Sequence, residues 1–377
     1  MVTIKEIAQR CGYSPATVSR LLNNDQTLSV TQTTRNKILK VANQLGYWKD
    51  RKKPAVAPTI ALLFRMNNQE QLQDSYFASL KDALLKTIED AGMQVKVFQY
   101  AEELIDQAEE FQGFLCVGDD NVELNVFKRL HRLLPAGVFV DTDPLPHLFD
   151  SVQPNLSMTV RDALEQFADA GYQRIAFIGG IGPQIGKRPR QRDSRETAFR
   201  VVAEELEFKQ ADVFSGGSFS VLNGRQLGKA AIKQYGDQLP EGFLIASDTL
   251  SVGVLQAFND AGVIVPRDTS IISINNSDIA EYVSPPLSTY NINQKVISRM
   301  ALNILRDAIA NPERPYVHAL VDTNLIMRES FVFYRSFYDA IKDLPRDVQG
   351  EIYTAIMEYS LYGKETENLK PIARSVF

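Results

Sequence analysis

The chain has 377 residues, of which 44% are hydrophobic and 23% are charged, and its formal net charge is -5. This length allows about two to four domains, and the composition is typical of a globular protein. No run approaches about 18 apolar residues and the N-terminus carries charges, so we predict neither a membrane span nor a signal peptide. Cys11 and Cys116 indicate neither a disulfide framework nor a zinc site. These observations favour a cytoplasmic protein without a metal or other cofactor.

The charge is distributed unevenly along the chain. Residues 1–53 contain ten lysines and arginines against three acids, a formal charge of +7, which leaves -12 for the remainder. Lys and Arg gain affinity for nucleic acid by displacing counterions from phosphate, so a basic segment on an acidic body favours a polyanion partner. The alternative is a solvated charged surface.

Residues 1–47 predict three short helices. Thr3–Glu6 is a capping box for the first helix, and Gly12 ends it. Ser14-Pro15 is a second start signal, with a Ser cap and Pro at the first helical position. The third helix occupies the segment Thr31–Gly46, from a Thr cap to a terminating glycine. Because only about three residues link the first two helices, we predict a helix-turn-helix unit.

The second helix of such a unit enters the major groove, and its N-terminal residues meet base edges. Arg20 can donate two hydrogen bonds to guanine, while Pro15 and Ala16 can make only apolar contacts. Hydroxyl and N–H groups at helix starts can hold phosphate. The alternative is an ordinary three-helix cap. The predicted DNA-binding residues are Thr3, Ser14, Pro15, Ala16, Thr17, Ser19, Arg20, Asn23, Thr31 and Thr34.

The segment TIKEIAQRCGYSPATVSRLLNNDQTLSVTQTTRNKILKVANQLGY, residues 3–47, resembles the head of the LacI/GalR family of bacterial transcription regulators. It carries the family's T-V-S-R-x-[LV]-N run at Thr17–Asn23, the Thr34-Arg35 pair and a final L-G-Y. The resemblance implies a homodimeric repressor that binds double-stranded operator DNA of palindromic sequence and responds to a small sugar.

The linker, residues 48–58, departs from the family pattern. Most members have a hinge helix there, with an Ala and a Leu that open the minor groove. This segment has no Leu, and Pro54 and Pro58 oppose a continuous helix. Three interpretations stay open: a short basic hinge whose Lys and Arg side chains touch phosphate, a weak wedge at Val56, or a solvated flexible linker.

From residue 59 onward, expected strands alternate with expected helices. Such alternation indicates parallel sheets with helices on both faces. Two series imply two doubly wound α/β lobes, and we expect the ligand in the cleft between them, at the carboxyl ends of the strands. The strands expected are Thr59–Phe64, Val95–Tyr100, Gly113–Val117 and Gly137–Val140, then Arg174–Gly179, Ala211–Phe214, Gly242–Ala246 and Ser270–Asn275.

The body is also similar to the family's sugar-sensing core, which itself resembles periplasmic sugar-binding proteins. The similarity lies in AGYQRIAFIGG (170–180), the segment 245–276 and SPPLSTYNIN (284–293), and the whole resemblance covers residues 2–330. The predicted organisation is a helix-turn-helix domain at 1–47, a linker at 48–58, a two-lobe sugar-sensing domain at 59–330 and a helical extension at 331–377.

The resemblance implies that six residues bind the effector. An arginine grips sugar hydroxyls, an aromatic ring stacks on the sugar, and polar residues after strands accept or donate hydrogen bonds. The alternative for each residue is a surface ion pair or a helix cap, and Asp248 starts a helix. The acid that the family usually has at the position of Asn275 is absent. The six residues are Arg65, Asp141, Arg195, Phe219, Asp248 and Asn275.

The loop 179–192 contains four basic residues, Lys187, Arg188, Arg190 and Arg192. It either binds the phosphate of a phosphosugar or is a solvated loop. Galactose or a galactoside is the first expectation for the effector, because the head and the basic linker resemble galactose-operon repressors.

No enzymatic motif stands out in the sequence. GxSxG, HExxH and P-loop strings do not occur, and His131, His147 and His318 have no obvious nucleophile beside them. We therefore predict a binding protein that is not an enzyme. The alternative function is a sugar-binding protein or carbohydrate enzyme with an incidental helix-turn-helix head.

Residues 331–377 lie beyond the family pattern. Phe333–Tyr338 and Ile341 form one apolar helical face, and Val348 and Ile352 belong to a second segment. The extension is similar to part of a small helical, phage-associated domain of unknown function. It represents a natural fusion, a fused or frameshifted gene product, or a tail packed on the dimer. Its many aromatic side chains predict burial.

Overall fold

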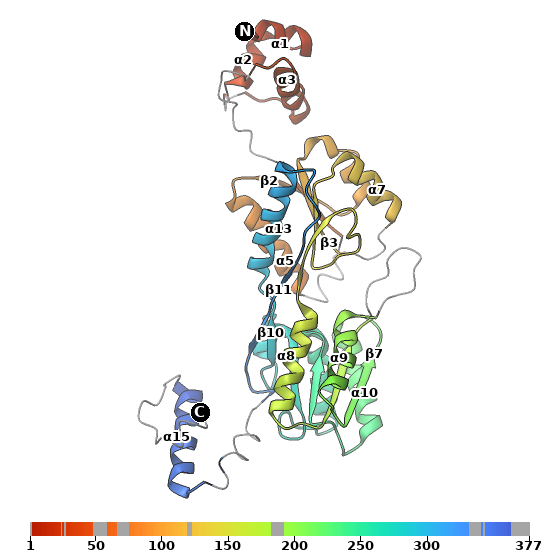
Figure 1. The fold of residues 1–377 in the computed structure, drawn as a ribbon, viewed down its shortest axis with the longest axis vertical. Helices are drawn as coiled ribbons and strands as arrows, with labels where there is room; N and C mark the ends of the chain where they lie inside the picture. Colours follow the sequence, from red (N-terminus) through yellow and green to blue (C-terminus); the bar gives the residue numbers. More distant parts are fainter. Residues whose placement is uncertain are drawn as a thin grey trace. The chain divides into compact units, whose positions relative to one another are not determined.

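The computed structural model describes residues 2–23, 25, 28–47, 59–65, 75–118, 123–181, 192–331, 341 and 344–362. The predicted linker at 48–58 therefore lies outside the described residues. The chain divides into two compact units. The first contains the described residues within 1–67, 79–153 and 294–319, and the second those within 68–78, 154–293 and 320–377. Figure 1 shows the helical head, two α/β lobes and a C-terminal helix.

The three predicted head helices are confirmed as α1 (Ile4–Cys11), α2 (Pro15–Leu22) and α3 (Gln32–Gln44). Thr3 N donates to Glu6 Oε2 at 2.8 Å and Glu6 N donates to Thr3 Oγ1 at 3.3 Å, which completes the capping box. Gly12 ends α1 at φ 77°, a conformation that glycine adopts without strain. The helices enclose a small core of Ile7, Ala8, Cys11, Val18, Leu21, Leu22, Ile38, Ala42 and Tyr47.

The first lobe is built on one sheet with the strand order β11-β5-β4-β3-β1-β2. Its strands are β1 (Thr59–Phe64), β2 (Gln94–Phe98), β3 (Gly113–Val117), β4 (Gly137–Val140), β5 (Asp150–Pro154) and β11 (His318–Val321). Its helices are α5 (Ser75–Asp90), α6 (Ala101–Ile105), the 3-10 turn η1 (Ala108–Glu110), α7 (Leu124–Leu133) and α13 (Gln294–Ala310).

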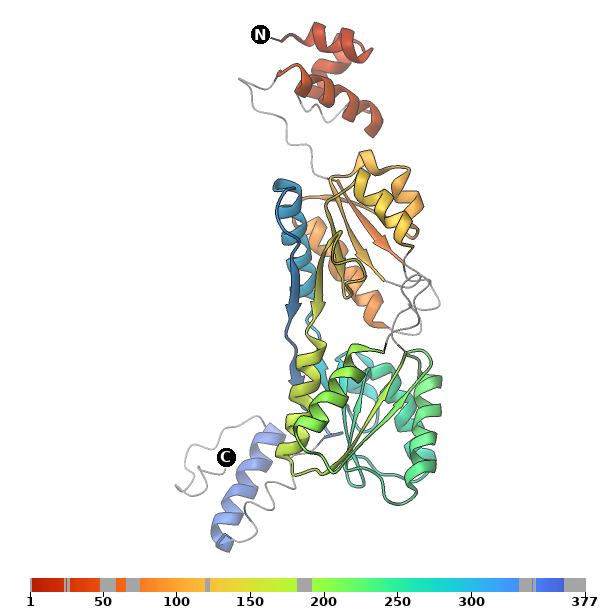
Figure 2. The same cartoon turned by 45° about the vertical axis from the view of Figure 1, so that its right-hand side comes forward.

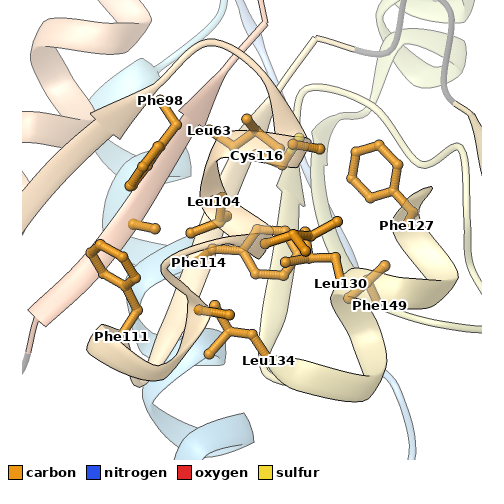
Figure 3. Packing of buried hydrophobic residues seen from close by; sticks show 14 of the residues in the cluster. Leu63, Phe98, Leu104, Phe111, Phe114, Cys116, Phe127, Leu130, Leu134 and Phe149 are labelled. Atoms are coloured by element: carbon orange, nitrogen blue, oxygen red, sulfur yellow. The ribbon is translucent and has the colours of Figure 1, made fainter.

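Aromatic side chains fill the first lobe beneath α6 and α7 (Figure 3). Phe114 meets Phe149 edge to face, with ring centroids 5.2 Å apart. Cys116 is buried within this core and Cys11 within the core of the head, and neither cysteine is part of a disulfide. Each ring buries a large apolar area, so the sheet and its helices form a rigid support for residues at the strand ends.

The second lobe has a sheet of the same size, in the order β12-β10-β9-β8-β6-β7. Helix α8 packs with α9 and α10 packs with α11, so helices cover both faces of the sheet (Figure 2). The strands are β6 (Arg174–Gly179), β7 (Gln210–Ser215), β8 (Gly242–Ile245), β9 (Ser270–Asn275), β10 (Ser288–Asn291) and β12 (Asn324–Ile326). The helices are α8 (Leu156–Asp169), α9 (Ser194–Glu205), α10 (Val221–Tyr235), α11 (Asp248–Asp260) and α12 (Ile279–Tyr282).

The doubly wound fold class predicted from the sequence is confirmed. The first strand of each lobe, β1 or β6, lies between the second and third strands, and it pairs in parallel with both. Successive connections therefore leave in opposite directions, which creates a topological switch point at the carboxyl ends of these strands. The expected elements did not include β5, β10, β11, β12 or α13, and α13 packs against β3 and β4 of the first lobe.

The second lobe ends at Ser330 and Phe331. Ser330 Oγ donates to the carbonyl oxygen of Ile271 at 2.7 Å and accepts from Ser288 N at 2.8 Å. Phe331 is fully buried and packs edge to face on Phe167, with centroids 5.6 Å apart. These contacts anchor the chain immediately before the extension.

The described part of the extension contains helix α15 (Arg346–Tyr362). Ile341, Val348 and Ile352 are buried in a small cluster with the partly buried Leu344, so these apolar residues of the two expected segments pack together. The aromatic run Phe333–Tyr338 lies outside the described residues. No helix of the described chain is long and apolar enough to cross a membrane.

Two glycines allow α10 and α11 to approach closely. A Cβ added at Gly253 would lie 2.0 Å from the carbonyl oxygen of Val221, and one at Gly224 would lie 2.1 Å from that of Leu250. Both contacts are with backbone, so a substitution must push the helices apart. The α10–α11 pair thus requires glycine at these two positions.

We expect Gly253→Ala to lower the free energy of unfolding by about 1–3 kcal/mol, the usual cost of overpacking. Urea titration followed by circular dichroism would measure it. Gly216→Ala is the matched control, because a Cβ there meets no atom within 4 Å. Equal stability of the two variants would contradict the close packing.

Candidate DNA-binding surface and ligand site

Helix α2 has one face in the core of the head and the other in solvent. Val18, Leu21 and Leu22 are buried. Their spacing of three and four residues puts them on one face of the helix, so the other residues of α2 lie on the opposite face. The structure therefore brings the predicted DNA-binding residues to the surface. Thr3, Ser14, Pro15, Ala16, Arg20, Asn23 and Thr31 are exposed, and Thr17, Ser19 and Thr34 are half-buried.

Two pairs of hydroxyl groups lie at helix N-termini of the head. Ser14 Oγ is 2.8 Å from Thr17 Oγ1 and accepts from Thr17 N at 3.1 Å. At the start of α3, Thr31 Oγ1 is 2.9 Å from Thr34 Oγ1, which is also 3.3 Å from the hydroxyl of Tyr13. The N-terminus of a helix is the positive end of its dipole, and hydroxyl groups beside it can donate hydrogen bonds, so both places suit a phosphate oxygen.

Arg20 is engaged by an acid that the sequence analysis did not single out. Its Nε donates to Asp25 Oδ2 at 2.7 Å, although the two side chains are 47% and 33% exposed. Asn23 Nδ2, at the end of α2, donates to Ser19 Oγ at 3.4 Å. Asp25 follows the end of α2, so no helical spacing in the sequence pointed to this pair.

In the second lobe, the guanidinium of Arg195 is held in one orientation. Nε and Nη2 donate to Asp193 Oδ1 and Oδ2 at 2.8 and 2.9 Å, and Nη1 donates to the carbonyl oxygen of Ala246 at 2.6 Å. The guanidinium carbon lies 4.6 Å from the centroid of the Phe219 ring. Arg195 thus connects the start of α9 to the end of β8, at the switch point beside β6.

Phe219 also lies close to the backbone after β6, since a Cβ at Gly180 would meet its Cε2 atom at 2.7 Å. The structure therefore brings together Arg195 and Phe219, two of the residues expected to bind the effector. A cation beside an aromatic face suits a sugar ring, which offers hydroxyls in its plane and C–H groups on its faces.

Asp193 carries the charge that orients Arg195. Burial acts to raise the pKa of this carboxyl, but the charge of Arg195 and its hydrogen bonds outweigh burial and lower the pKa below 3.8. Asp193 also caps α9 by accepting from Arg195 N at 2.9 Å. A carboxylate with these bonds stays ionised, and the arginine stays fixed.

Asp248 has a different environment from the one expected of an effector ligand. It is fully buried, with Oδ2 accepting from Ser277 N and Oγ at 2.7 and 2.9 Å and Oδ1 accepting from Thr289 Oγ1 at 2.7 Å. Burial raises its pKa, and the hydrogen bonds oppose that rise. Ser247, and not Asp248, caps α11. These contacts connect α11 to the segment after β9 and to β10.

Three polar residues at the end of a strand or directly after one have a left-handed backbone. Asn275 has φ 117° and Asn276 has φ 53°, at the end of β9, and Asp141 has φ 73° after β4. Non-glycine residues rarely adopt such angles, and they cluster at functional sites. Asn275 is 8% exposed, and Asn276 Oδ1 accepts from Arg328 Nη2 at 3.0 Å. Asn276 is therefore a further candidate that the sequence analysis did not name.

The remaining two effector candidates, Arg65 and Asp141, belong to the first lobe. Arg65 N donates to Val117 O at 3.0 Å, and its guanidinium carbon is 5.5 Å from the centroid of the Phe127 ring. Asp141 N donates to Val152 O at 2.8 Å. Both side chains therefore start at the carboxyl ends of strands in their own sheet, where parallel sheets bind ligands.

A hollow of about 460 Å³ lies in the second lobe beside the ends of β6 and β7. Glu196 is buried there, and its Oε1 accepts from Arg192 at 3.2 Å and from Arg200 at 2.9 Å. Of the basic loop predicted to bind phosphate or to be solvated, Lys187, Arg188 and Arg190 lie outside the described residues. The described lining is Gly180, Ile181, Arg192, Asp193, Glu196, Arg200, Val213 and Ser215.

Comparisons with protein-family models divide the chain into three parts. Residues 3–50 match the bacterial regulatory proteins of the lacI family, and residues 164–331 match a periplasmic binding protein-like domain. Residues 330–377 match a family of unknown function. Separate family models thus match the head and most of the second lobe.

Whole-chain comparisons agree with that division. The HTH-type transcriptional regulator LacR of Lactobacillus helveticus is 51% identical over 332 residues, which cover 88% of this chain and 99% of LacR. The structure of the lac repressor dimer bound to operator and the anti-inducer ONPF has a TM-score of 0.61 at 18% identity, over 87% of this chain and 98% of that chain. A lacI-family regulator from Arthrobacter sp. FB24 in complex with lactose has a TM-score of 0.60 at 18% identity, over 74% and 100%.

A helix-turn-helix head and two doubly wound lobes define a DNA-binding transcriptional regulator with a periplasmic-binding-protein-like body. The chain belongs to the lacI family of bacterial regulatory proteins. This membership confirms the family resemblance predicted from residues 3–47, and the prediction of a regulator that is not an enzyme.

The pair Asp193–Arg195 predicts a pH dependence. In the wild type, the lowered pKa of Asp193 stabilises the fold above the ordinary pKa of Asp, and this contribution is lost as pH falls through the lowered pKa. Arg195→Gln leaves burial as the dominant effect, so the pKa of Asp193 should rise. Protonation of Asp193 should then stabilise the folded variant as pH falls. The difference in free energy of unfolding between the wild type and the variant should therefore shrink from neutral pH towards about pH 3.

Urea unfolding at a series of pH values would measure that difference. Arg225→Gln is the control. Arg225 lowers the pKa of Asp260 in the same lobe, but both side chains are about half exposed, so the loss of stability and its change with pH should be smaller than for Arg195→Gln. A difference between wild type and Arg195→Gln that does not change with pH would contradict the assignment.

Proposed function

We propose that this regulator is a cytoplasmic homodimeric repressor that binds a palindromic operator through its head and changes its operator affinity when a small sugar binds its body. The observation that carries the proposal is the solvent-exposed polar face of α2, supported by a packed three-helix core, in a chain of this family. The helix-turn-helix domain extends over 1–47, the linker over 48–58, the sensing domain over 59–330 and the extension over 331–377.

In this proposal α2 enters the major groove. Arg20 donates to guanine, Pro15 and Ala16 contact apolar base edges, and Thr17, Ser19 and Asn23 complete the polar contacts. The hydroxyls of Thr3, Ser14, Thr31 and Thr34 hold phosphates. Their positions at helix starts support this division between base and backbone contacts.

The sugar binds residues at the strand ends of both lobes. Arg195 donates to ring hydroxyls, Phe219 packs against the sugar, and Arg65, Asp141 and Asn275 supply further polar contacts. Asp248 acts as a positioning residue instead, since three hydrogen bonds already occupy its two oxygens. A sugar that binds two arrangements of the lobes unequally shifts their populations, and operator affinity changes as a result.

The effector that we propose is galactose or a galactoside. The lactose complex of the Arthrobacter regulator, which shares this fold, supports a sugar as the class of effector. The site chemistry supports a neutral sugar, because the guanidinium of Arg195 is already neutralised by Asp193. Its hydrogen-bonding capacity is therefore directed at hydroxyls more than at a phosphate.

Selection from a pool of random-sequence DNA duplexes tests operator binding by the full chain. We expect a palindromic sequence to be enriched and to bind much more tightly than a single half-site, because both heads of a dimer contribute. Arg20→Ala should lose about 1–3 kcal/mol of discrimination at one base pair in each half-site. Arg225→Ala, in the second lobe, should leave the preference unchanged. Failure to enrich any palindrome would refute the proposal.

Fluorescence anisotropy of labelled operator tests the sugar response. Galactose or lactose should shift the operator dissociation constant of the wild type, and Arg195→Gln should require at least about tenfold more sugar for the same shift, since it loses a fixed donor. Thermal melting would verify that the variant folds, and Arg225→Gln should respond like the wild type. A wild type that responds to neither sugar would contradict galactose and lactose as effectors.

A further inference from the structure

Asp25 is an acid on a surface that binds a polyanion. Among the described residues of the head, the acidic side chains are Glu6 and Asp25. Glu6 has a structural task, because its carboxylate completes the capping box of α1. Asp25 has no such task in a helix, and a negative charge near phosphates weakens DNA binding. Its presence beside α2 therefore calls for a different role.

The backbone holds Asp25 in place at the end of α2. Asp25 N donates to Arg20 O at 3.0 Å, and Leu28 N donates to Asp25 O at 3.1 Å. Leu28 in turn packs against the hydrophobic core of the head. These bonds fix the backbone of Asp25. The 2.7 Å hydrogen bond that Arg20 Nε donates to the carboxylate therefore orients the guanidinium of Arg20.

The bond to Nε limits which nitrogen atoms of Arg20 can donate hydrogen bonds to a base. A guanidinium donates two parallel hydrogen bonds to guanine O6 and N7, either through Nε and one Nη or through both Nη atoms. With Nε bonded to Asp25, the end-on approach through both Nη atoms is favoured. The carboxylate also restrains a long side chain that would otherwise lose rotamer freedom on binding.

We propose that Asp25 is a positioning residue that sets the base preference of Arg20. It aligns the guanidinium for guanine and, through its charge, disfavours the binding of Arg20 to phosphate on unrelated DNA. Asp25 thereby lowers the affinity for DNA of unrelated sequence and raises the discrimination between sequences. This inference rests on the proposed operator binding and extends it to a residue outside the recognition helix.

Asp25→Asn removes the charge and keeps the size of the side chain. Affinity for random-sequence DNA should rise, because one repulsive charge is gone. Discrimination for guanine at the base pair contacted by Arg20 should fall about tenfold, within the range of one bidentate contact. Asp25→Glu keeps the charge and should retain more discrimination than Asp25→Asn. In an Arg20→Ala background, Asp25→Asn should produce no further loss at that base pair.

Glu6→Gln is the matched control, since it removes the same charge from the head while Gln can still complete a capping box. It should raise affinity for random DNA and leave base preference unchanged. The measurements are binding-site selection and competition titrations with full-length protein, with circular dichroism to verify folding. A structural role for Asp25 would lower the melting temperature without altering preference at one base pair.

The outcomes separate this inference from the proposed function. If the wild type enriches an operator and Asp25→Asn changes affinity equally for all sequences, the positioning role is refuted and operator binding stands. If Arg20→Ala and Asp25→Asn lose discrimination at different base pairs, the positioning role is likewise refuted. If the wild type enriches no operator, the proposed function fails and the inference fails with it.

Discussion

The parallel pairing of β6 with both β7 and β8 is the constraint on which the ligand site of the second lobe depends. It places the end of β6, the start of α9 and the end of β8 next to each other. Arg195 uses this arrangement, since it bonds to Asp193 at the start of α9 and to Ala246 after β8. The same strand order around β1 brings Arg65 to the corresponding edge of the first sheet. The same strand order in both sheets therefore positions the candidate effector-binding residues of each lobe.

Buried charge in the second lobe is organised in two ways. Asp193 has a cation against it, so its pKa is lowered and the pair can present a fixed guanidinium to a ligand. Asp248 is surrounded by hydroxyl and N–H donors, and burial raises its pKa. The first arrangement suits recognition, whereas the second joins α11 to the segment after β9 and to β10. Two aspartates that look alike in the sequence thus have different tasks because their surroundings differ.

The head combines local and tertiary determinants of DNA binding. Helix caps position hydroxyls at the starts of α2 and α3, and these follow from short sequence patterns. The orientation of Arg20 depends on Asp25, whose backbone is held by Arg20 O and by the Leu28 segment. Under the proposed operator binding, the base preference of α2 would therefore depend on a neighbour that orients the guanidinium of Arg20 before DNA binds.

The sequence by itself determined the three head helices, the alternation of strands and helices, and the exposed residues of α2, because caps, turns and hydrophobic periodicity are local signals. It also indicated Arg195 and Phe219 through the family resemblance. Only the tertiary structure decided that α13 packs on the first lobe, that Asp248 is enclosed by Ser277 and Thr289, and that Asp25 engages Arg20. These three features depend on contacts between residues that are distant in sequence or lie outside any periodic element. Composition and residue spacing therefore do not predict them.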